Sequence, residues 1–71
     1  MKISYDNEAD ALYICLVEGD FEENREVMPG VILDVGKKGE LLGIEVLDVS
    51  ARYSLKEIAH MDINLHLETV E

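Results

Sequence analysis

The stretch Gly43-Ile44-Glu45-Val46-Leu47-Asp48-Val49-Ser50 is the longest β-like run in this chain of 71 residues. It carries one carboxylate in its middle, Glu45, and ends in an Asp-x-Ser sequence. Because aliphatic and β-branched residues favour extended backbone, the run predicts the strand around which the rest of the chain is organised. The segments before it are expected to pair beside it as strands, and the segment after it to fold back on it as a helix.

The N-terminal seventeen residues predict a β-hairpin. Residues 2–6 alternate apolar and polar side chains, residues 7–10 are polar and prone to turns, and residues 11–17 are apolar throughout. If Asp6 lies opposite Ala11 across the turn, the apolar side chains of both strands share one face. These side chains are Ile3, Tyr5, Leu12, Ile14 and Leu16.

An acidic segment follows, from Glu18 to Glu26, in which Arg25 is the only base. The segment is expected to form a long connection that ends in a short edge strand from Arg25 to Met28. Charges along such an edge discourage sheets of different molecules from pairing.

A second hairpin is predicted from Val31–Val35, a tight Gly36–Gly39 connection and a returning strand over Glu40–Val49. We take Val35 to lie opposite Glu40. One face is then wholly apolar and is the expected core: Val31, Leu33, Leu42, Ile44 and Val46. The other face holds Ile32, Leu41, Leu47 and Val49, with Gly43 and Glu45 between them.

The C-terminal third contains a helix-start signal, Ser54-x-x-Glu57, with the spacing of a capping box. Leu55, Ile58 and Ala59 give the following helix one apolar face. After Asp62 the apolar residues alternate again, which predicts a final strand.

The expected architecture is a single α+β domain spanning residues 1–71. It consists of an antiparallel sheet of about five or six strands, arranged as a meander of hairpins, with one short helix in the C-terminal half. Two strands are apolar on both faces, and one helix covers only part of one face. The leftover apolar surface predicts a homodimer, to which the C-terminal strand is expected to contribute by pairing with a sister chain.

The charge balance is strongly acidic, with 16 acids against 6 bases and a net charge of −10. This charge disfavours direct binding to nucleic acid and to anionic membranes, and it favours a basic partner protein. No apolar run approaches the length of a membrane span, and the N-terminus does not resemble a signal peptide. Together with a single cysteine, Cys15, expected to be a buried and inert thiol, these features predict a cytoplasmic location.

Glu45 is the leading candidate binding residue, because the strand pattern places it on an apolar face beside Gly43. A carboxylate there is expected to bind either a polar ligand or a lysine or arginine of a partner protein. The alternative is that it pairs with Arg52 of the same chain, at the start of the helix. Tyr13 is expected, like Tyr5, at the sheet margin with its hydroxyl in water.

Three further candidates, Asp6, Asp10 and Asp48, converge if the first hairpin lies beside the central strand. Clustered carboxylates suit a hard divalent cation such as magnesium or calcium. The alternative is that Asp10 is an ordinary turn residue and Asp48 an ordinary strand terminator.

Catalytic and metal-binding motifs are absent from the sequence. His60-x-Asp62-x-x-x-His66 contains metal-ligand residue types, but its spacing matches no zinc signature. There is no phosphate-binding loop, cysteine pair or nucleophile elbow. The sequence predicts no cofactor and no metal, and it favours a binding protein over an enzyme.

Several ordered blocks resemble the family called domain of unknown function 2283, over about Lys2–Ser50. They are Tyr5-Asp6, Asp10-Ala11-Leu12-Tyr13-Ile14, Val31-Ile32-Leu33-Asp34, Gly39, and Gly43 to Asp48 followed by Ser50. The family's usual Asp-Ala-Ser ending is Asp48-Val49-Ser50 here. The resemblance implies a compact β-rich domain without known catalytic residues. It also permits a role as the small acidic, antitoxin-like partner of a basic protein.

Three functions therefore remain open from the sequence. The first is a protein-binding or regulatory module that docks a basic partner, for which the family resemblance permits an antitoxin-like role. The second is a minor enzyme, or a protein that binds a small molecule or a divalent cation, with a site formed by Glu45 and the nearby aspartates. The third is a purely structural homo-oligomer.

Overall fold

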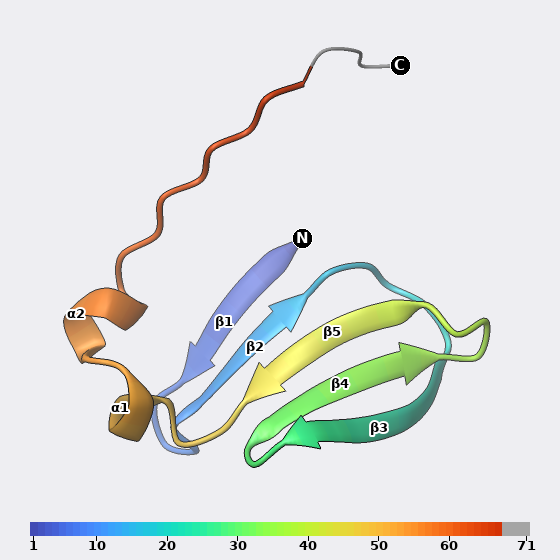
Figure 1. The fold of residues 1–71 in the computed structure, drawn as a ribbon, viewed down its shortest axis with the longest axis horizontal. Helices are drawn as coiled ribbons and strands as arrows, with labels where there is room; N and C mark the ends of the chain where they lie inside the picture. The colour runs from blue at the N-terminus through green and yellow to red at the C-terminus, as the bar shows by residue number, and fades with distance from the viewer. Residues whose placement is uncertain (68–71) are drawn as a thin grey trace.

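A computed structural model describes residues 1–67 as one antiparallel sheet followed by two short helices (Figure 1). The strand order is β1-β2-β5-β4-β3, so the strand built on the Gly43 stretch is central, as predicted. The elements are β1 (Lys2–Asp6), β2 (Ala11–Cys15), β3 (Phe21–Met28), β4 (Val31–Gly36), β5 (Leu41–Val46), α1 (Val49–Arg52) and α2 (Leu55–Ile58). The described chain is therefore α+β, with five strands and two short helices.

The register of the first hairpin is the predicted one. Asp6 pairs with Ala11, so Ile3 lies opposite Ile14 and Tyr5 opposite Leu12. The hairpin then joins the central strand, because β2 pairs antiparallel with β5.

The sheet has two chemically different faces, because residues directly opposite each other in neighbouring strands share a face. The apolar face is formed by two rows that cross β1, β2, β5 and β4. They are Ile3–Ile14–Ile44–Leu33 and Tyr5–Leu12–Val46–Val31.

The polar face carries the two rows that alternate with those of the apolar face. It differs from the apolar face in holding carboxylate, amide and hydroxyl side chains. Its rows are Ser4–Tyr13–Glu45–Ile32–Glu26 and Lys2–Cys15–Gly43–Asp34–Asn24.

A register shift in the second hairpin corrects one prediction. Val35 pairs with Leu41, whereas the sequence pattern placed it opposite Glu40. The extra residue lies between the Asp34–Gly43 and Val35–Leu41 pairs, and a one-residue slip exchanges the faces of a strand. Leu42 therefore leaves the expected core face and is buried beside Gly19, while Leu41 lies opposite Val35.

The acidic edge strand is longer than predicted. β3 begins at Phe21, four residues before the expected start, and all eight of its residues are exposed. The connection through residues 16–20 leads from β2 around the end of the sheet to this edge (Figure 1). The chain crosses the sheet here, and this crossing positions the candidate site.

The central strand ends at Val46, earlier than the predicted Val49. Asp48 adopts a left-handed backbone conformation with φ 52°, which turns the chain out of the sheet and into α1. Ser50 was expected to cap the following helix, but it lies inside α1.

The second helix has the predicted capping box between Ser54 and Glu57, with both reciprocal hydrogen bonds present. It does not fold back on the sheet, however. Leu55 is 62% exposed, and both helices lie beyond the end of β5 (Figure 1). Four residues are too few for the apolar stripe that holds a longer helix on a sheet.

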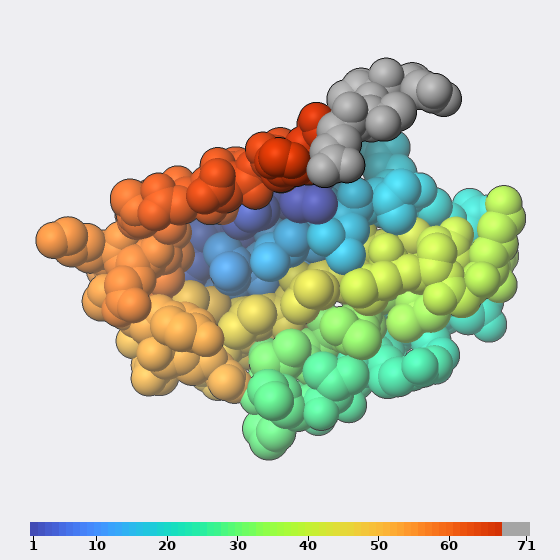
Figure 2. All heavy atoms as spheres, turned by 45° about the horizontal axis from the view of Figure 1, so that its top comes forward, coloured from blue at the N-terminus to red at the C-terminus, as the bar shows by residue number. Residues whose placement is uncertain are grey.

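The prediction of a C-terminal strand is wrong for residues 61–67, which belong to neither helix nor strand. Figure 2 shows this segment as a separate ridge on the β1 side of the molecule. The rest of the predicted strand, residues 68–71, lies outside the described residues. Among the helices of residues 1–67, none has the length and apolar character needed to cross a membrane.

Candidate functional site

A hydrogen-bonded group of side chains crosses the polar face at the centre of the sheet. The Tyr13 hydroxyl donates to Oδ2 of Asp34 at 2.8 Å, reaching from β2 across β5 to β4. The amide of Asn24 on β3 donates to Oδ1 of the same carboxylate at 2.5 Å. Both oxygens of Asp34 are thus held in place by side chains from neighbouring elements.

The bond to Asp34 raises the pKa of Tyr13 to about 12, with burial as the second cause. The phenol therefore stays protonated and keeps donating across the physiological range. Tyr13 was expected to keep its hydroxyl in water, and the structure corrects this. The hydroxyl of Tyr5 is also engaged, donating to Asp10 at 2.6 Å.

Gly43 makes the crossing possible. The ring of Tyr13 passes over Gly43 to reach Asp34, and Asp34 is the residue of β4 that pairs with Gly43. A Cβ at Gly43 would lie 2.9 Å from the carbonyl oxygen of Ile14 and closer still to the Tyr13 hydroxyl. The notch that the sequence predicted at Gly43 is present, and it is filled by the tyrosine of the same chain.

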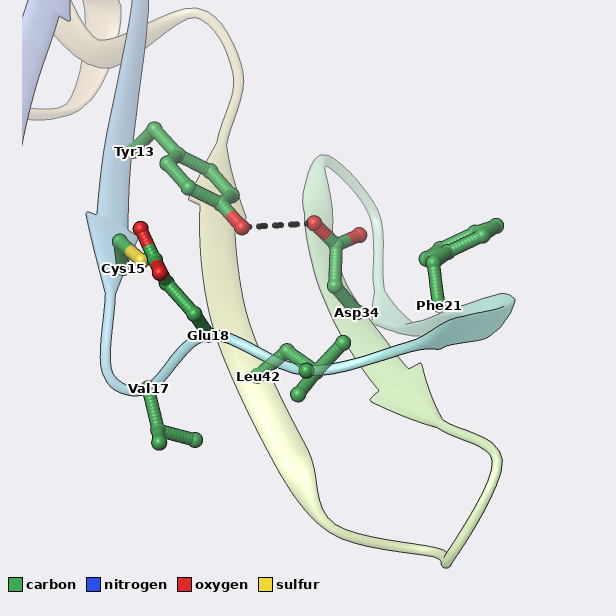
Figure 3. A pocket seen from close by; sticks show the side chains of 8 residues that line it. Tyr13, Cys15, Val17, Glu18, Phe21, Asp34 and Leu42 are labelled. Atoms are coloured by element: carbon green, nitrogen blue, oxygen red, sulfur yellow. Dashed lines mark hydrogen bonds between the residues drawn. The ribbon is translucent and has the colours of Figure 1, made fainter.

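A hollow of about 450 Å³ opens beside this group, between the polar face and the connection from β2 to β3. Figure 3 shows Tyr13 and Asp34 joined across β5, with Glu18 and Leu42 near them and Phe21 on the far side of Asp34. The lining residues come from β2, the connection after it, β3, β4 and β5: Tyr13, Cys15, Val17, Glu18, Gly19, Phe21, Asp34 and Leu42.

The chemistry of the hollow is acidic and aromatic. Its lining includes the carboxylates of Glu18 and Asp34, the rings of Tyr13 and Phe21, and no lysine or arginine. Carboxylates bind guanidinium and ammonium groups, and aromatic faces attract the same cations. The aliphatic side chains of the lining, such as Leu42, suit the stem of a long basic side chain.

Glu45, the leading sequence candidate, lies between Tyr13 and Ile32. It shares a face with Ile32 and Gly43, as predicted, but this face is polar, whereas the strand pattern described it as largely apolar. It is half-buried but does not line the hollow. Its predicted alternative partner, Arg52, is occupied elsewhere. The guanidinium donates to the carbonyl oxygens of Leu47 and Pro29 and so ties α1 to the β3–β4 turn.

The three candidate aspartates do not converge on one point. Asp10 accepts from Tyr5 and from both the backbone N–H and the hydroxyl of Ser50, and these bonds lower the pKa of its carboxyl. Asp6 accepts from two backbone N–H groups within its own turn. Asp48 supplies the left-handed residue before α1, without a side-chain cap.

The possible metal ligands are likewise dispersed. Within residues 1–67, no group of three or more His, Cys, Asp or Glu side chains is arranged to hold a metal ion. The His60 ring lies 3.2 Å from the carboxylate of Asp62, on the exposed segment after α2. Cys15 was expected to be buried but is half-exposed in the lining of the hollow.

The sequence analysis named Tyr13 but missed Asp34, Asn24, Glu18 and Phe21 as site residues. One signal was present. Asp34 is the single carboxylate in an otherwise apolar strand, and the notch residue Gly43 lies opposite it once the register is known. The contributions of Glu18 and Phe21 depend on the path of the connection, which the strand patterns do not determine.

Comparison with known proteins gives one match. The family model described as "Protein of unknown function (DUF2283)" matches residues 2–50, which include all five strands and every residue of the hollow. No curated protein and no solved structure matches.

Proposed function

This chain belongs to the DUF2283 family of proteins of unknown function, and we propose that it is a protein-binding module whose acidic side docks a basic partner. The observation that carries the proposal is the hollow beside Tyr13 and Asp34. It offers two carboxylates and two aromatic rings to a cationic side chain, and no basic residue of its own lining competes for them.

The surroundings of the hollow support a cationic partner. The edge strand β3 and the connection before it carry Glu18, Asp20, Glu22, Glu23 and Glu26. The only base of this segment, Arg25, is paired with Glu23 at 2.5 Å. An acidic surface of this extent accelerates the approach of a basic protein and discriminates against acidic ones.

Docking through side chains fits this edge better than addition of a strand. A peptide that extends a sheet needs a regular row of free backbone groups along the edge. The pairing of β3 with β4 shifts register between Phe21 and Glu23 and again between Glu26 and Met28. Such irregularities interrupt the ladder and protect an edge from strand addition. We therefore expect an arginine or lysine of the partner to enter the hollow.

The experiment is affinity capture from the native host, at low and at high salt, with three baits. The baits are the wild type, a double variant that carries both Glu18→Gln and Phe21→Ala, and the control variant Glu8→Gln. Glu8 lies in the β1–β2 turn, away from the hollow, and its substitution removes the same single charge.

A basic protein retained by the wild type and by Glu8→Gln, lost by the double variant and released at high salt supports the proposal. If Glu8→Gln and the double variant weaken binding equally, binding depends on net charge alone, and the hollow is not the docking site. If the bait inhibits the activity of the captured partner, the result would match the antitoxin-like role that the family resemblance permits.

The hollow also favours a second candidate, a small organic cation in place of a partner's side chain. The lining residues are the same, and Asp34 takes the role that the sequence analysis gave to Glu45. A thermal-shift screen with free arginine and with other guanidinium and amine metabolites tests it. A concentration-dependent rise in melting temperature that disappears in the Glu18→Gln, Phe21→Ala variant would favour this candidate.

A further inference from the structure

The apolar face of the sheet is left uncovered by the described chain. Among the hydrophobic side chains of residues 1–67, only Leu42 and Val49 are buried, and neither is a member of the two apolar rows. Ile3 is 40% exposed, and the other members of the two apolar rows are half-buried. Five strands with one bare apolar face form a single layer, whereas stable domains pack at least two layers around a core.

Residues 47–67, the part of the chain after β5 that the structure describes, do not supply the second layer. Both helices lie beyond the end of β5, and α2 has no buried residue. The apolar residues of the segment that follows are more exposed than those of the sheet. Ile63, Leu65 and Leu67 are 70%, 74% and 69% exposed.

The surplus surface has the size of a protein interface. The accessible surface of the chain is 5924 Å². A compact monomer of 8.0 kDa exposes about 4,500 Å², so this chain exposes roughly 1,500 Å² more. A standard interface removes about 800 Å² from each partner. Part of this excess belongs to the exposed segment after α2, so it is an upper limit on the area that the apolar face offers to a partner.

We propose that a second copy of this chain covers the apolar face, sheet against sheet, to form a two-layer sandwich with two-fold symmetry. On the edge strand β3 this face carries Arg25, opposite Leu33, in an ion pair with Glu23. The two rows across β1, β2, β5 and β4 carry no charge, so an identical face meets them without burying an unpaired ion. Aliphatic and β-branched residues from the two sheets interdigitate in such packings, with about 10 Å between the layers. The acidic hollow lies on the opposite face and remains free in the dimer.

The test is the molar mass in solution, measured by sedimentation velocity for the wild type and for two matched variants. Leu33→Lys and Ile32→Lys change adjacent residues of β4 by the same substitution, on opposite faces of the sheet. Each variant makes the chain one unit less negative, so loss of the dimer in Leu33→Lys cannot come from added repulsion. At position 32 the new lysine lies between Glu45 and Glu26, which favours folding of the control.

At micromolar concentration we expect twice the 8.0 kDa chain mass for the wild type and for Ile32→Lys, and the single mass for Leu33→Lys. Salt provides an independent signature. Because two chains of net charge −10 repel each other, added salt tightens the dimer, whereas it weakens the docking of a basic partner. Failure of one proposal is thus distinguishable from failure of the other.

A second measurement covers the case in which Leu33→Lys does not fold. In wild-type protein with labelled methyl groups, a soluble paramagnetic probe should relax the methyls of Ile32 and spare those of Ile14 and Leu33. A wild type of 8.0 kDa at every concentration, or methyls on both faces relaxed alike, would overturn the proposal. So would a monomer that captures a foreign protein through this face.

Discussion

Replacing Gly43 with alanine should disrupt the polar face at its centre. The new Cβ would lie 2.9 Å from the carbonyl oxygen of Ile14, which belongs to the neighbouring strand and cannot swing away. It would also meet the end of the Tyr13 ring, which must move off Asp34. We therefore expect loss of the Tyr13–Asp34 hydrogen bond together with local strain in the β2–β5 pair.

The magnitude follows from three contributions. A hydrogen bond to a charged group contributes about 1.5 kcal/mol at the lower end of its range, which suits a part-buried pair. Crowding against the fixed carbonyl adds about 1 kcal/mol. Alanine recovers about 0.5–1 kcal/mol by restricting the unfolded chain. The net loss is about 1.5–2 kcal/mol, or a fall in melting temperature of roughly 6–16 °C for a domain of this size.

The assay combines urea unfolding with an absorbance titration of the tyrosines. The variant should unfold at lower urea, and the pKa of Tyr13 should fall from about 12 towards the ordinary value of 10.0. Gly39→Ala serves as the control. A Cβ there meets no atom within 4 Å, so this variant strains only a turn with φ 79° and leaves the Tyr13 titration unchanged.

A Gly43→Ala protein that unfolds at the wild-type urea concentration and keeps the high Tyr13 pKa would refute this account of the polar face. A double-mutant cycle with Tyr13→Phe adds a sharper check. In the phenylalanine background the alanine should destabilise by about 1.5 kcal/mol less, because the hydrogen bond is already gone.

Three further predictions concern single residues. Asp34→Asn removes the charge that holds the phenol proton, so the pKa of Tyr13 should fall from about 12 towards 10.0, measured by ultraviolet titration. The wild type loses the stability linked to this proton as the pH rises from 10.0 to about 12, and the variant should lack both this stability and its loss. Asp10 has a lowered pKa in the folded state, so its contribution is present above the ordinary value of 3.8 and is lost as the pH falls through the lower folded value. The Asp10→Asn variant should therefore be less stable than the wild type at neutral pH. Its melting temperature should change less than that of the wild type as the pH falls below about 4. Ser54→Ala should leave the urea midpoint unchanged, because α2 has no buried residue, while amide exchange at Ile58 rises about fivefold.

Much of the fold follows from local sequence patterns. The hairpin register from Asp6 and Ala11 was predictable because the turn length and the alternation agree. That Val31 and Leu33 share a face with Ile44 and Val46 was also predictable from the alternation. Their register was not, because placing Val35 opposite Glu40 pairs Val31 with Ile44, whereas its partner is Val46. The capping box at Ser54 was readable because it depends on two residues three positions apart.

The remaining features depend on non-local geometry. The bulge that moves Leu42 out of the expected core adds one residue to one strand, and the alternating pattern does not reveal it. Asp34 becomes a site residue only because β2 and β4 lie on either side of β5, which brings Tyr13 within reach. The predicted final strand failed over residues 61–67 because alternation alone provides no neighbouring strand to pair with.

The most direct test of the central claim is an NMR titration of the ¹⁵N-labelled protein with a short arginine-rich peptide at low salt. We predict amide shifts concentrated at Glu18, Gly19, Phe21 and Asp34, which saturate with the peptide and reverse when salt is added. The Glu18→Gln, Phe21→Ala variant should lose them. Shifts spread evenly over the acidic surface, or confined to the apolar face, would contradict the assignment of the hollow as the docking site.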